Sequence, residues 1–257
     1  MAQHARPSAR DATAGSVDAD EVARFAAQAE RWWDERGPLR ALHALNPTRI
    51  AFIRDRVAAR LDRDPLGERP LGGLRLLDIG CGGGLLAEPM ARLGAKVVGI
   101  DAAAENVRVA AAHARDGGLE IDYRLATAEA LAAAGERYDV VLNMEVVEHV
   151  ADQDIFIAAS CDLVAPGGTL FVATLNRTFK SFALAIVGAE YVLRWLEPGT
   201  HDWRKFVRPA ELARRLRRGG VTVQEITGVR YNLLAASWSL GRDLSVNYMA
   251  MAVKEGS

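Results

Sequence analysis

A glycine-rich segment in the first half of the chain has the residue types and spacing of a ligand-binding loop. Asp78, Gly80, Gly82 and Gly84 alternate within the segment DIGCGGG, which follows a short apolar run and precedes a helical pattern. Glycines at a strand-to-helix turn let a ligand approach the backbone closely, which predicts a nucleotide or nucleoside site. Asp101, at the end of the next apolar run, has the position of an acid that binds ribose hydroxyls.

The charge of Asp78 discriminates between two ligands for this loop. Gly82, Gly84 and Ala87 also fit a dinucleotide fingerprint, but a pyrophosphate would then lie near the Asp78 carboxylate. S-adenosylmethionine brings an ammonium and a sulfonium instead, so Asp78 favours this methyl donor. The spacing Asp-x-Gly-x-Gly-x-Gly is that of class I methyltransferases, and no Tyr-x-x-x-Lys pair supports a short-chain dehydrogenase. The remaining alternative is a loop that makes only a tight turn.

Three further polar residues follow the fourth predicted strand, at the sheet edge where open α/β folds bind ligands. A helical turn there would place Glu145, Glu148 and His149 on one face. Such a set can bind a hard divalent cation, which would lower the pKa of a substrate hydroxyl. His149 could instead act without metal as a general base. In the non-catalytic alternative, Glu145 anchors a loop and His149 is an interior histidine.

The elements that position these residues follow from the hydrophobic pattern. After residue 73, short apolar runs alternate with helical patterns, which predicts a parallel sheet with helices on both faces. The predicted strands are LRLLDI, KVVGI, IDYRL, YDVVLN, GTLFVATL, VTVQEITG and VNYMAMAV. Helices are predicted over residues 85–93, 105–115 and 155–164, and after Pro209.

The amino-terminal part has a different texture. An amphipathic helix is predicted from Val17 to Asp34 and a second one after Pro47, before a connection rich in Pro, Gly and charge over 62–73. On the first helix, Trp32 and Trp33 either cover the site or serve ordinary packing. The predicted division is a flexible tail (1–16), amino-terminal cap helices (17–70) and one catalytic domain (71–257).

Composition limits the partners and the compartment. The 257 residues carry a net charge of -1, so no overall basic field attracts nucleic acid. The two cysteines stand far apart, which argues against a disulfide framework or a zinc site. The amino terminus has no signal-peptide pattern, and no run of 18 apolar residues occurs. We therefore expect a cytoplasmic protein.

Motifs across the chain give a more specific indication. The run Arg31–Asp34, the pair Asn46 and Pro47, and the segments LLDIGCGGGLLAEPMARLGAKVVGID, MEVVEHV, TLNRTFKS, VGAEYVLRWLEPGTHDW and VNYM resemble the ubiquinone biosynthesis O-methyltransferases. This similarity extends from about Val17 over nearly the whole chain. It implies a Rossmann-like class I methyltransferase fold, with a mostly parallel seven-stranded sheet and an antiparallel last strand. The implied reaction is transfer of a methyl group from S-adenosylmethionine to a catechol-type hydroxyl of a polyprenylated ubiquinone precursor, namely 2-polyprenyl-6-hydroxyphenol and 3-demethylubiquinol.

The same resemblance assigns roles to individual residues. It implies that Arg49 and Met144 complete the donor pocket, and a fixed guanidinium could pair with the methionine carboxylate. The alternatives are an exposed arginine and a gap-filling core methionine. The resemblance also implies a magnesium-type ion at Glu145, Glu148 and His149, which we prefer to metal-free general base catalysis.

An apolar helix is predicted within an insertion at about residues 177–206. It could cover the active site, line a channel for an isoprenoid tail or lie in a bilayer interface. A basic stretch from Arg204 to Arg218 follows, and it is either a patch for anionic lipid or a solvated face. The polyprenyl substrates favour peripheral contact with the inner face of the membrane, and other enzymes of the ubiquinone pathway are candidate partners. Two rival functions are another small-molecule O- or N-methyltransferase and a non-catalytic quinone- or lipid-binding module.

Overall fold

A twisted sheet forms the centre of the molecule in the computed structural model, which describes residues 15–183, 202–232 and 237–256. Within these residues the sheet has eight strands in the order β3-β2-β1-β4-β5-β8-β6-β7. The strands are β1 (Arg75–Ile79), β2 (Lys96–Asp101), β3 (Asp122–Leu125), β4 (Tyr138–Met144), β5 (Val164–Leu175), β6 (Val221–Asn232), β7 (Ser237–Gly241) and β8 (Asn247–Lys254). Strands β1 to β5 pair in parallel, and β8 lies antiparallel between β5 and β6. The predicted fold class, with its antiparallel last strand, is confirmed.

One edge strand was not among those predicted. Strand β7 pairs antiparallel with the end of β6, from Asn232 opposite Ser237 to Gly228 opposite Gly241. Its five residues, SWSLG, alternate between exposed and half-buried positions. Such a short edge strand has too weak an apolar alternation to stand out in the sequence.

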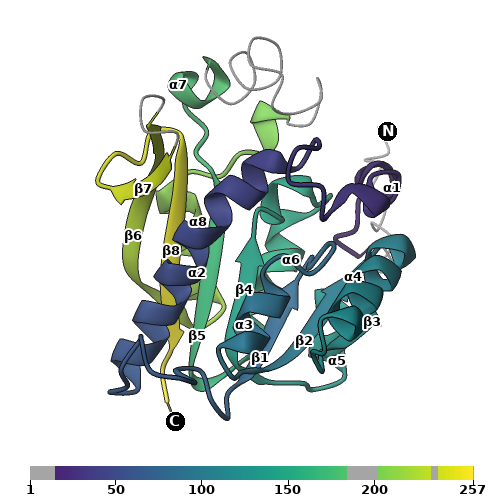
Figure 1. Cartoon of the computed structure of the whole chain (residues 1–257). Coiled ribbons are helices and arrows are strands. Elements are labelled where there is room, and N and C mark those ends of the chain that lie inside the picture. The colour runs from purple at the N-terminus through teal and green to yellow at the C-terminus, as the bar shows by residue number, and fades with distance from the viewer. Residues whose placement is uncertain (1–14, 184–201, 233–236, 257) are drawn as a thin grey trace, which may run out of the picture.

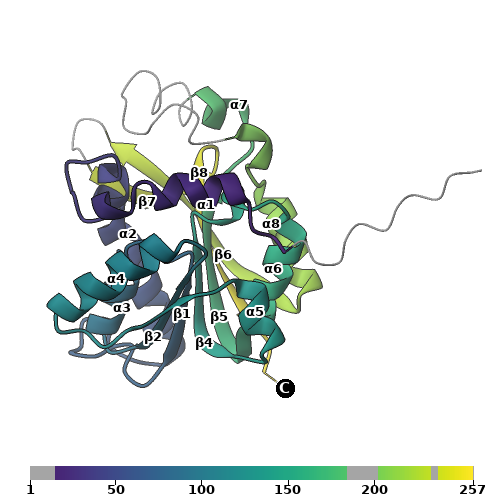
Figure 2. The same ribbon diagram turned by 90° about the vertical axis from the view of Figure 1, so that its right-hand side faces the viewer.

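Helices cover both faces of the sheet, as Figure 2 shows. One face carries α2 (Arg40–Arg60), α3 (Ala87–Arg92) and α4 (Ala104–Asp116), and the other carries α5 (Ala128–Ala133), α6 (Gln153–Asp162) and α8 (Pro209–Arg218). Each face has its own apolar core. On the α2 face, Phe52 meets Phe171 of β5 edge to face, with ring centroids 5.7 Å apart.

Helix α2 begins earlier than the sequence predicts. It runs through Pro47, which lacks the N–H that would bond to the His43 carbonyl. This costs about 3 kcal/mol in a helix interior. The buried side chains of Leu45, Phe52 and Ile53 offset that cost, since each contributes about 1.5–3 kcal/mol on burial.

The predicted helix over residues 17–34 is shorter in the structure. It consists of α1 (Ala19–Ala26) followed by a 3₁₀ turn at Ala29–Arg31. The interruption lets Trp33 donate to Gly83 O in the glycine loop and Trp32 donate to Asn106 Oδ1 on α4, each through its indole nitrogen. The helix is therefore interrupted, and the two indoles form tertiary hydrogen bonds in its place.

Helix α1 lies across the carboxyl edge of the parallel strands (Figures 1 and 2). Asp18, its N-cap, pairs with Lys205 at 2.8 Å, and the Ser16 carbonyl accepts a bond from Ala151 N at 2.7 Å. Ser16, the last residue of the predicted tail, is therefore buried. Residues 1–14 of that tail lie outside the described residues.

The predicted inserted helix also falls largely outside the described residues. Its flanks contain two short turns, α7 (Phe179–Ser181) and a 3₁₀ turn at Trp203–Lys205, while residues 184–201 are not described. No helix in the described segments is both long and apolar enough to cross a bilayer.

Candidate active site

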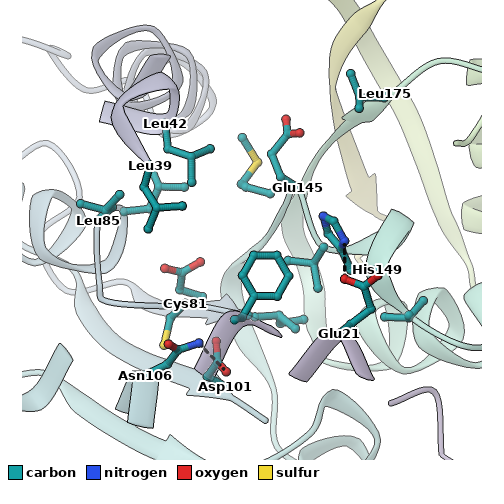
Figure 3. A pocket seen from close by; sticks show the side chains of 18 of the residues that line it. Glu21, Leu39, Leu42, Cys81, Leu85, Asp101, Asn106, Glu145, His149 and Leu175 are labelled. Atoms are coloured by element: carbon teal, nitrogen blue, oxygen red, sulfur yellow. Dashed lines mark hydrogen bonds and ion pairs between the residues drawn. The ribbon is translucent and has the colours of Figure 1, made fainter. Parts of the chain in front are cut away.

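A large pocket opens below α1, at the carboxyl edge of β1, β2 and β4. Its cavity volume is about 610 Å³, within the range of small-molecule sites. Figure 3 shows Asp101 and Asn106 toward one side of it and Glu145, His149 and Leu175 toward the other. We call these sides the glycine-loop end and the carboxylate end.

The glycine loop turns back under the two tryptophans. Gly80, Gly82 and Gly84 have φ angles of +67°, +53° and +91°, which glycine adopts at little cost. A Cβ on Gly82 would lie 2.3 Å from Cζ2 of Trp32, so indole and backbone are already in contact. Trp32 and Trp33 therefore pack against this loop and hold it in place.

Gly82→Ala should damage the site through this contact. We expect a loss of about 2–3 kcal/mol in the free energy of unfolding, because backbone strain adds to overpacking against Trp32. Displacement of the loop should also raise the donor Kd more than about tenfold. Urea unfolding and calorimetric titration with S-adenosylmethionine measure the two effects.

Gly135→Ala is the matched control for this substitution. Gly135 has φ +77° but nothing within 4 Å of the position of a Cβ. The Gly135→Ala variant should lose only about 1 kcal/mol in the free energy of unfolding and bind the donor with the wild-type Kd. Equal losses for the two variants would contradict the role of the tryptophan contact.

Asp101 is held in a fixed orientation at the glycine-loop end. Its Oδ2 accepts a bond from Gly82 N at 2.9 Å, and its Oδ1 accepts bonds from Ala103 N at 2.8 Å and Asn106 Nδ2 at 3.2 Å. Trp32 Nε1 in turn donates to Asn106 Oδ1 at 2.8 Å. Burial raises the pKa of Asp101 above its ordinary value. The structure thus brings Asp101 to the pocket as predicted and adds Asn106 as its support.

Opposite charges with unused hydrogen-bonding atoms face each other near the glycine loop. Asp78 is 3% exposed, and its Oδ2 has no hydrogen-bond partner among the described residues. Arg49 is 4% exposed; its Nε has no such partner, and its Nη2 is in an ion pair with Glu145. Burial, followed by repulsion from Asp101, raises the pKa of Asp78 to about 7, although Arg49 opposes that shift. Both residues line the pocket. A buried acceptor beside buried cationic donors suits a ligand that carries an ammonium and a carboxylate.

Glu145, Glu148 and His149 do not share a helical face, so that prediction is wrong. Strand β4 ends at Met144, Glu145 has φ +60°, and only Val147–His149 form a 3₁₀ turn. Because the left-handed residue redirects the chain, the His149 side chain turns toward Glu21 and away from the two glutamates. Met144 itself is buried and lines the pocket.

The two glutamates nevertheless remain neighbours. Arg49 Nη2 lies 3.1 Å from Glu145 Oε1, and Thr174 Oγ1 donates to Glu148 Oε2 at 2.9 Å. Burial and the adjacent Glu145 charge raise the pKa of Glu148 well above its usual range. A hydrogen bond between the two carboxyl groups adds to this rise, because a protonated Glu148 can donate to Glu145.

Two adjacent carboxylates could hold a hard cation, which would neutralise the repulsion between them. The third predicted ligand does not join them. No group of three His, Cys, Asp or Glu side chains that could hold a metal forms within the part of the chain that the structure describes. His149 lines the pocket and turns toward α1 instead (Figure 3).

His149 is paired with a residue that the sequence did not suggest. Its Nδ1 lies 3.0 Å from Glu21 Oε2, and Phe25 meets its ring edge to face at 5.1 Å. Burial raises the pKa of Glu21, but the hydrogen bond from His149 and the nearby positive charges hold it below its ordinary value. An ionised carboxylate can only accept, so Nδ1 carries a proton, and in the neutral imidazole the lone pair is then on Nε2.

Arg24 completes this arrangement. Its Nη2 forms an ion pair with Glu21 Oε2 and lies farther, at 3.4 Å, from His149 Nδ1. Because 128 residues separate Glu21 from His149, no local spacing could have linked them. Only the position of α1 over the pocket does so.

Known proteins are similar to this chain in fold and in sequence. A model of the methyltransferase domain family matches residues 43–226. Among solved structures, the magnesium protoporphyrin IX methyltransferase of Synechocystis PCC 6803 with bound SAM aligns with a TM-score of 0.62 at 17% identity, covering 95% of this chain and 100% of the other. Together with the glycine loop and the strand order, the match over residues 43–226 defines the protein as a class I methyltransferase.

Curated relatives narrow the class to one family. The ubiquinone biosynthesis O-methyltransferase of Brucella anthropi is 58% identical over 92% of this chain and 96% of its own length. That of Methylobacterium sp. (strain 4-46) is 59% identical over 93% of this chain and 96% of its own length. The chain belongs to the ubiquinone biosynthesis O-methyltransferases.

Proposed function

We propose that this protein transfers the methyl group of S-adenosylmethionine to a catechol-type hydroxyl of polyprenylated ubiquinone precursors, 2-polyprenyl-6-hydroxyphenol and 3-demethylubiquinol. The observation that carries the donor assignment is that Asp78 and Arg49 are both buried in the pocket lining. Their unpartnered atoms, Asp78 Oδ2 and Arg49 Nε, suit the ammonium and carboxylate of a methionine group. Asp101 then faces the ribose, while Gly80, Gly82 and Gly84 allow close approach along the loop.

The carboxylate end supplies the groups for the acceptor. Without a metal ion, His149 Nε2 takes the proton of the acceptor hydroxyl while Glu21 holds the other ring nitrogen. The resulting oxygen attacks the methyl carbon, the carbon–sulfur bond breaks, and its electron pair stays on sulfur. Met144 borders the donor beside this reaction. Helix α1 covers the site and limits access of water.

A divalent cation of the magnesium type is part of the proposal. Glu145 and Glu148 would hold it through their carboxylate oxygens, and His149 would be the third ligand through Nε2 while Nδ1 stays on Glu21. Such an ion would lower the pKa of the acceptor hydroxyl. In its absence, His149 alone accepts the proton.

Turnover with labelled donor tests the function and the need for metal together. We expect labelled methyl groups on a short-chain prenylated catechol and not on an amine of similar size. Chelation should lower kcat about 10²-fold or more, and Mg²⁺ should restore it. Calorimetric titration with Mg²⁺ should show heat for the wild type and none for Glu148→Gln. Product formation that is indifferent to chelator would contradict the metal, and methylation of the amine alone would contradict the acceptor class.

We also propose peripheral contact with anionic lipid through α8. Arg214, Arg217 and Arg218 are exposed and form no ion pair with another described residue. Binding of liposomes should weaken roughly 30-fold in the double variant Arg214→Gln and Arg218→Gln, at about 1 kcal/mol per charge. Cosedimentation at low salt measures this, with the exposed pair Arg137→Gln and Arg242→Gln as control. Equal binding by both double variants would place the contact elsewhere.

A further inference from the structure

The carboxylate end of the pocket continues past Glu145 to the antiparallel strands. There, Trp238 Nε1 and Asn247 Oδ1 are buried with no hydrogen-bond partner among the residues that the structure describes, and both residues line the pocket. Asn247 is only 8% exposed. A buried donor or acceptor without a partner costs about 1–3 kcal/mol, so native proteins seldom retain one unless a ligand or water pairs with it.

The position of Asn247 is fixed by the sheet. It begins β8 opposite Leu175 of β5 on one side and Val229 of β6 on the other. Alternate residues of a strand share a face, so Asn247 lies on the same side as Met249, which packs in one core with Met144. The amide is therefore on the pocket side that carries Met144 and α2.

Trp238 approaches the same region from β7. Its carbonyl oxygen accepts a bond from Thr48 Oγ1 at 3.4 Å, one residue before Arg49 on α2. Arg49 in turn reaches Glu145 at 3.1 Å. The Trp238 ring lies 5.1 Å from that of Tyr231 on β6. The indole thus forms part of the wall around the carboxylate end.

The chemistry of the two unpartnered atoms discriminates between the ligand groups that could bind beside Trp238 and Asn247. An isoprenoid chain has no polar atoms and would leave both orphaned atoms unsatisfied. The polar groups of the donor already have Asp78, Arg49 and Asp101 to receive them. An oxygenated aromatic ring presents hydroxyl donors and oxygen acceptors at its edge, together with apolar faces for Leu175 and Val229.

We infer that Asn247 and Trp238 position the acceptor ring and determine which ring oxygens are recognised. Asn247 Oδ1 accepts a hydrogen bond from the catechol hydroxyl that is not methylated. Trp238 Nε1 donates to a further ring oxygen, which 3-demethylubiquinol has and a simple catechol lacks. This inference depends on the proposed function and assigns the two substrates different contacts in one site.

The test compares Asn247→Leu and Trp238→Phe with two probes, a short-chain prenylated catechol and the corresponding demethylubiquinol. Asn247→Leu should raise KM for both probes about 3- to 10-fold. Trp238→Phe should raise KM by the same factor for the quinol only. In both variants kcat and the donor Kd should stay within about twofold of wild type, which a general structural defect would not permit.

Thr227→Val is the matched control. Thr227 is a similarly buried polar residue of β6 that bonds to Gly241 O at 3.2 Å and does not line the pocket. Its KM values should equal those of the wild type. Should Asn247→Leu fail to fold, the quinol-to-catechol KM ratio of Trp238→Phe decides, because phenylalanine keeps an aromatic ring in the wall.

The outcomes separate this inference from the proposed function. Suppose the wild type turns over normally and both variants have the same KM values and the same quinol-to-catechol KM ratio as the wild type. That result would overturn the ring assignment and leave the proposed reaction intact. Wild-type protein that methylates neither probe would overturn both.

Discussion

His149→Ala should lower kcat for methyl transfer about 10²- to 10⁴-fold without changing the donor Kd more than about twofold. The imidazole lies at the carboxylate end, whereas Asp101, one of the proposed donor contacts, lies at the glycine-loop end. The alanine variant loses the group that takes the acceptor proton, and also a proposed cation ligand. Single-turnover kinetics with labelled donor measure the rate of methyl transfer, and calorimetric titration measures the donor Kd.

A matched control exists elsewhere in the chain. His113 Nδ1 lies 2.6 Å from the buried Glu88, so His113→Ala also removes an imidazole from a glutamate but outside the pocket. Its kcat should remain near that of the wild type. Glu21→Gln should give an intermediate loss, since the amide can still contact His149 but no longer stabilises its positive charge. Unimpaired methyl transfer by His149→Ala would remove the histidine from the mechanism.

Asp78→Asn should stabilise the free protein while weakening donor binding. The pKa of Asp78 is about 7 in the folded protein against an ordinary value of 3.8, so folding favours its protonated form. The stability that this proton binding contributes is fully present below about pH 4 and is lost as the pH rises through 7. Asparagine avoids the buried charge, so the variant should have a higher Tm than the wild type at pH 8 and a smaller difference at pH 5.

Donor affinity should increase as the pH rises, whereas the stability of the free protein decreases. The ionised carboxylate attracts the donor ammonium, so the wild-type Kd should fall as the pH rises from 6 to 8. Asp78→Asn should raise the Kd at pH 8 about 10- to 100-fold and lose this pH dependence. Calorimetric titrations at pH 6 and pH 8 measure the donor Kd, with the exposed Asp116→Asn as control. A variant that binds the donor as tightly as the wild type would exclude an Asp78–ammonium contact.

The local features of the site were predictable because they depend on neighbouring residues. Glycines at fixed spacing between a strand and a helix specify the loop, and the apolar runs specify the parallel strands. The failure at Glu145 is equally local in origin. A helical interpretation assumed ordinary backbone angles after β4, and the left-handed residue at φ +60° redirects the chain there.

By itself, the sequence of this protein determined the fold class, the glycine loop with Asp78 and Asp101, and the family, since each is encoded in short contiguous segments. Only the tertiary structure decided which side chains meet across the pocket: Glu21 with His149, Arg49 with Glu145, and Asn247 beside Leu175. These pairs join residues far apart in the chain, whose contacts depend on how α1, α2 and the antiparallel strands pack around the sheet. Hydrophobic burial determines that packing over whole elements, and no spacing along the sequence records it.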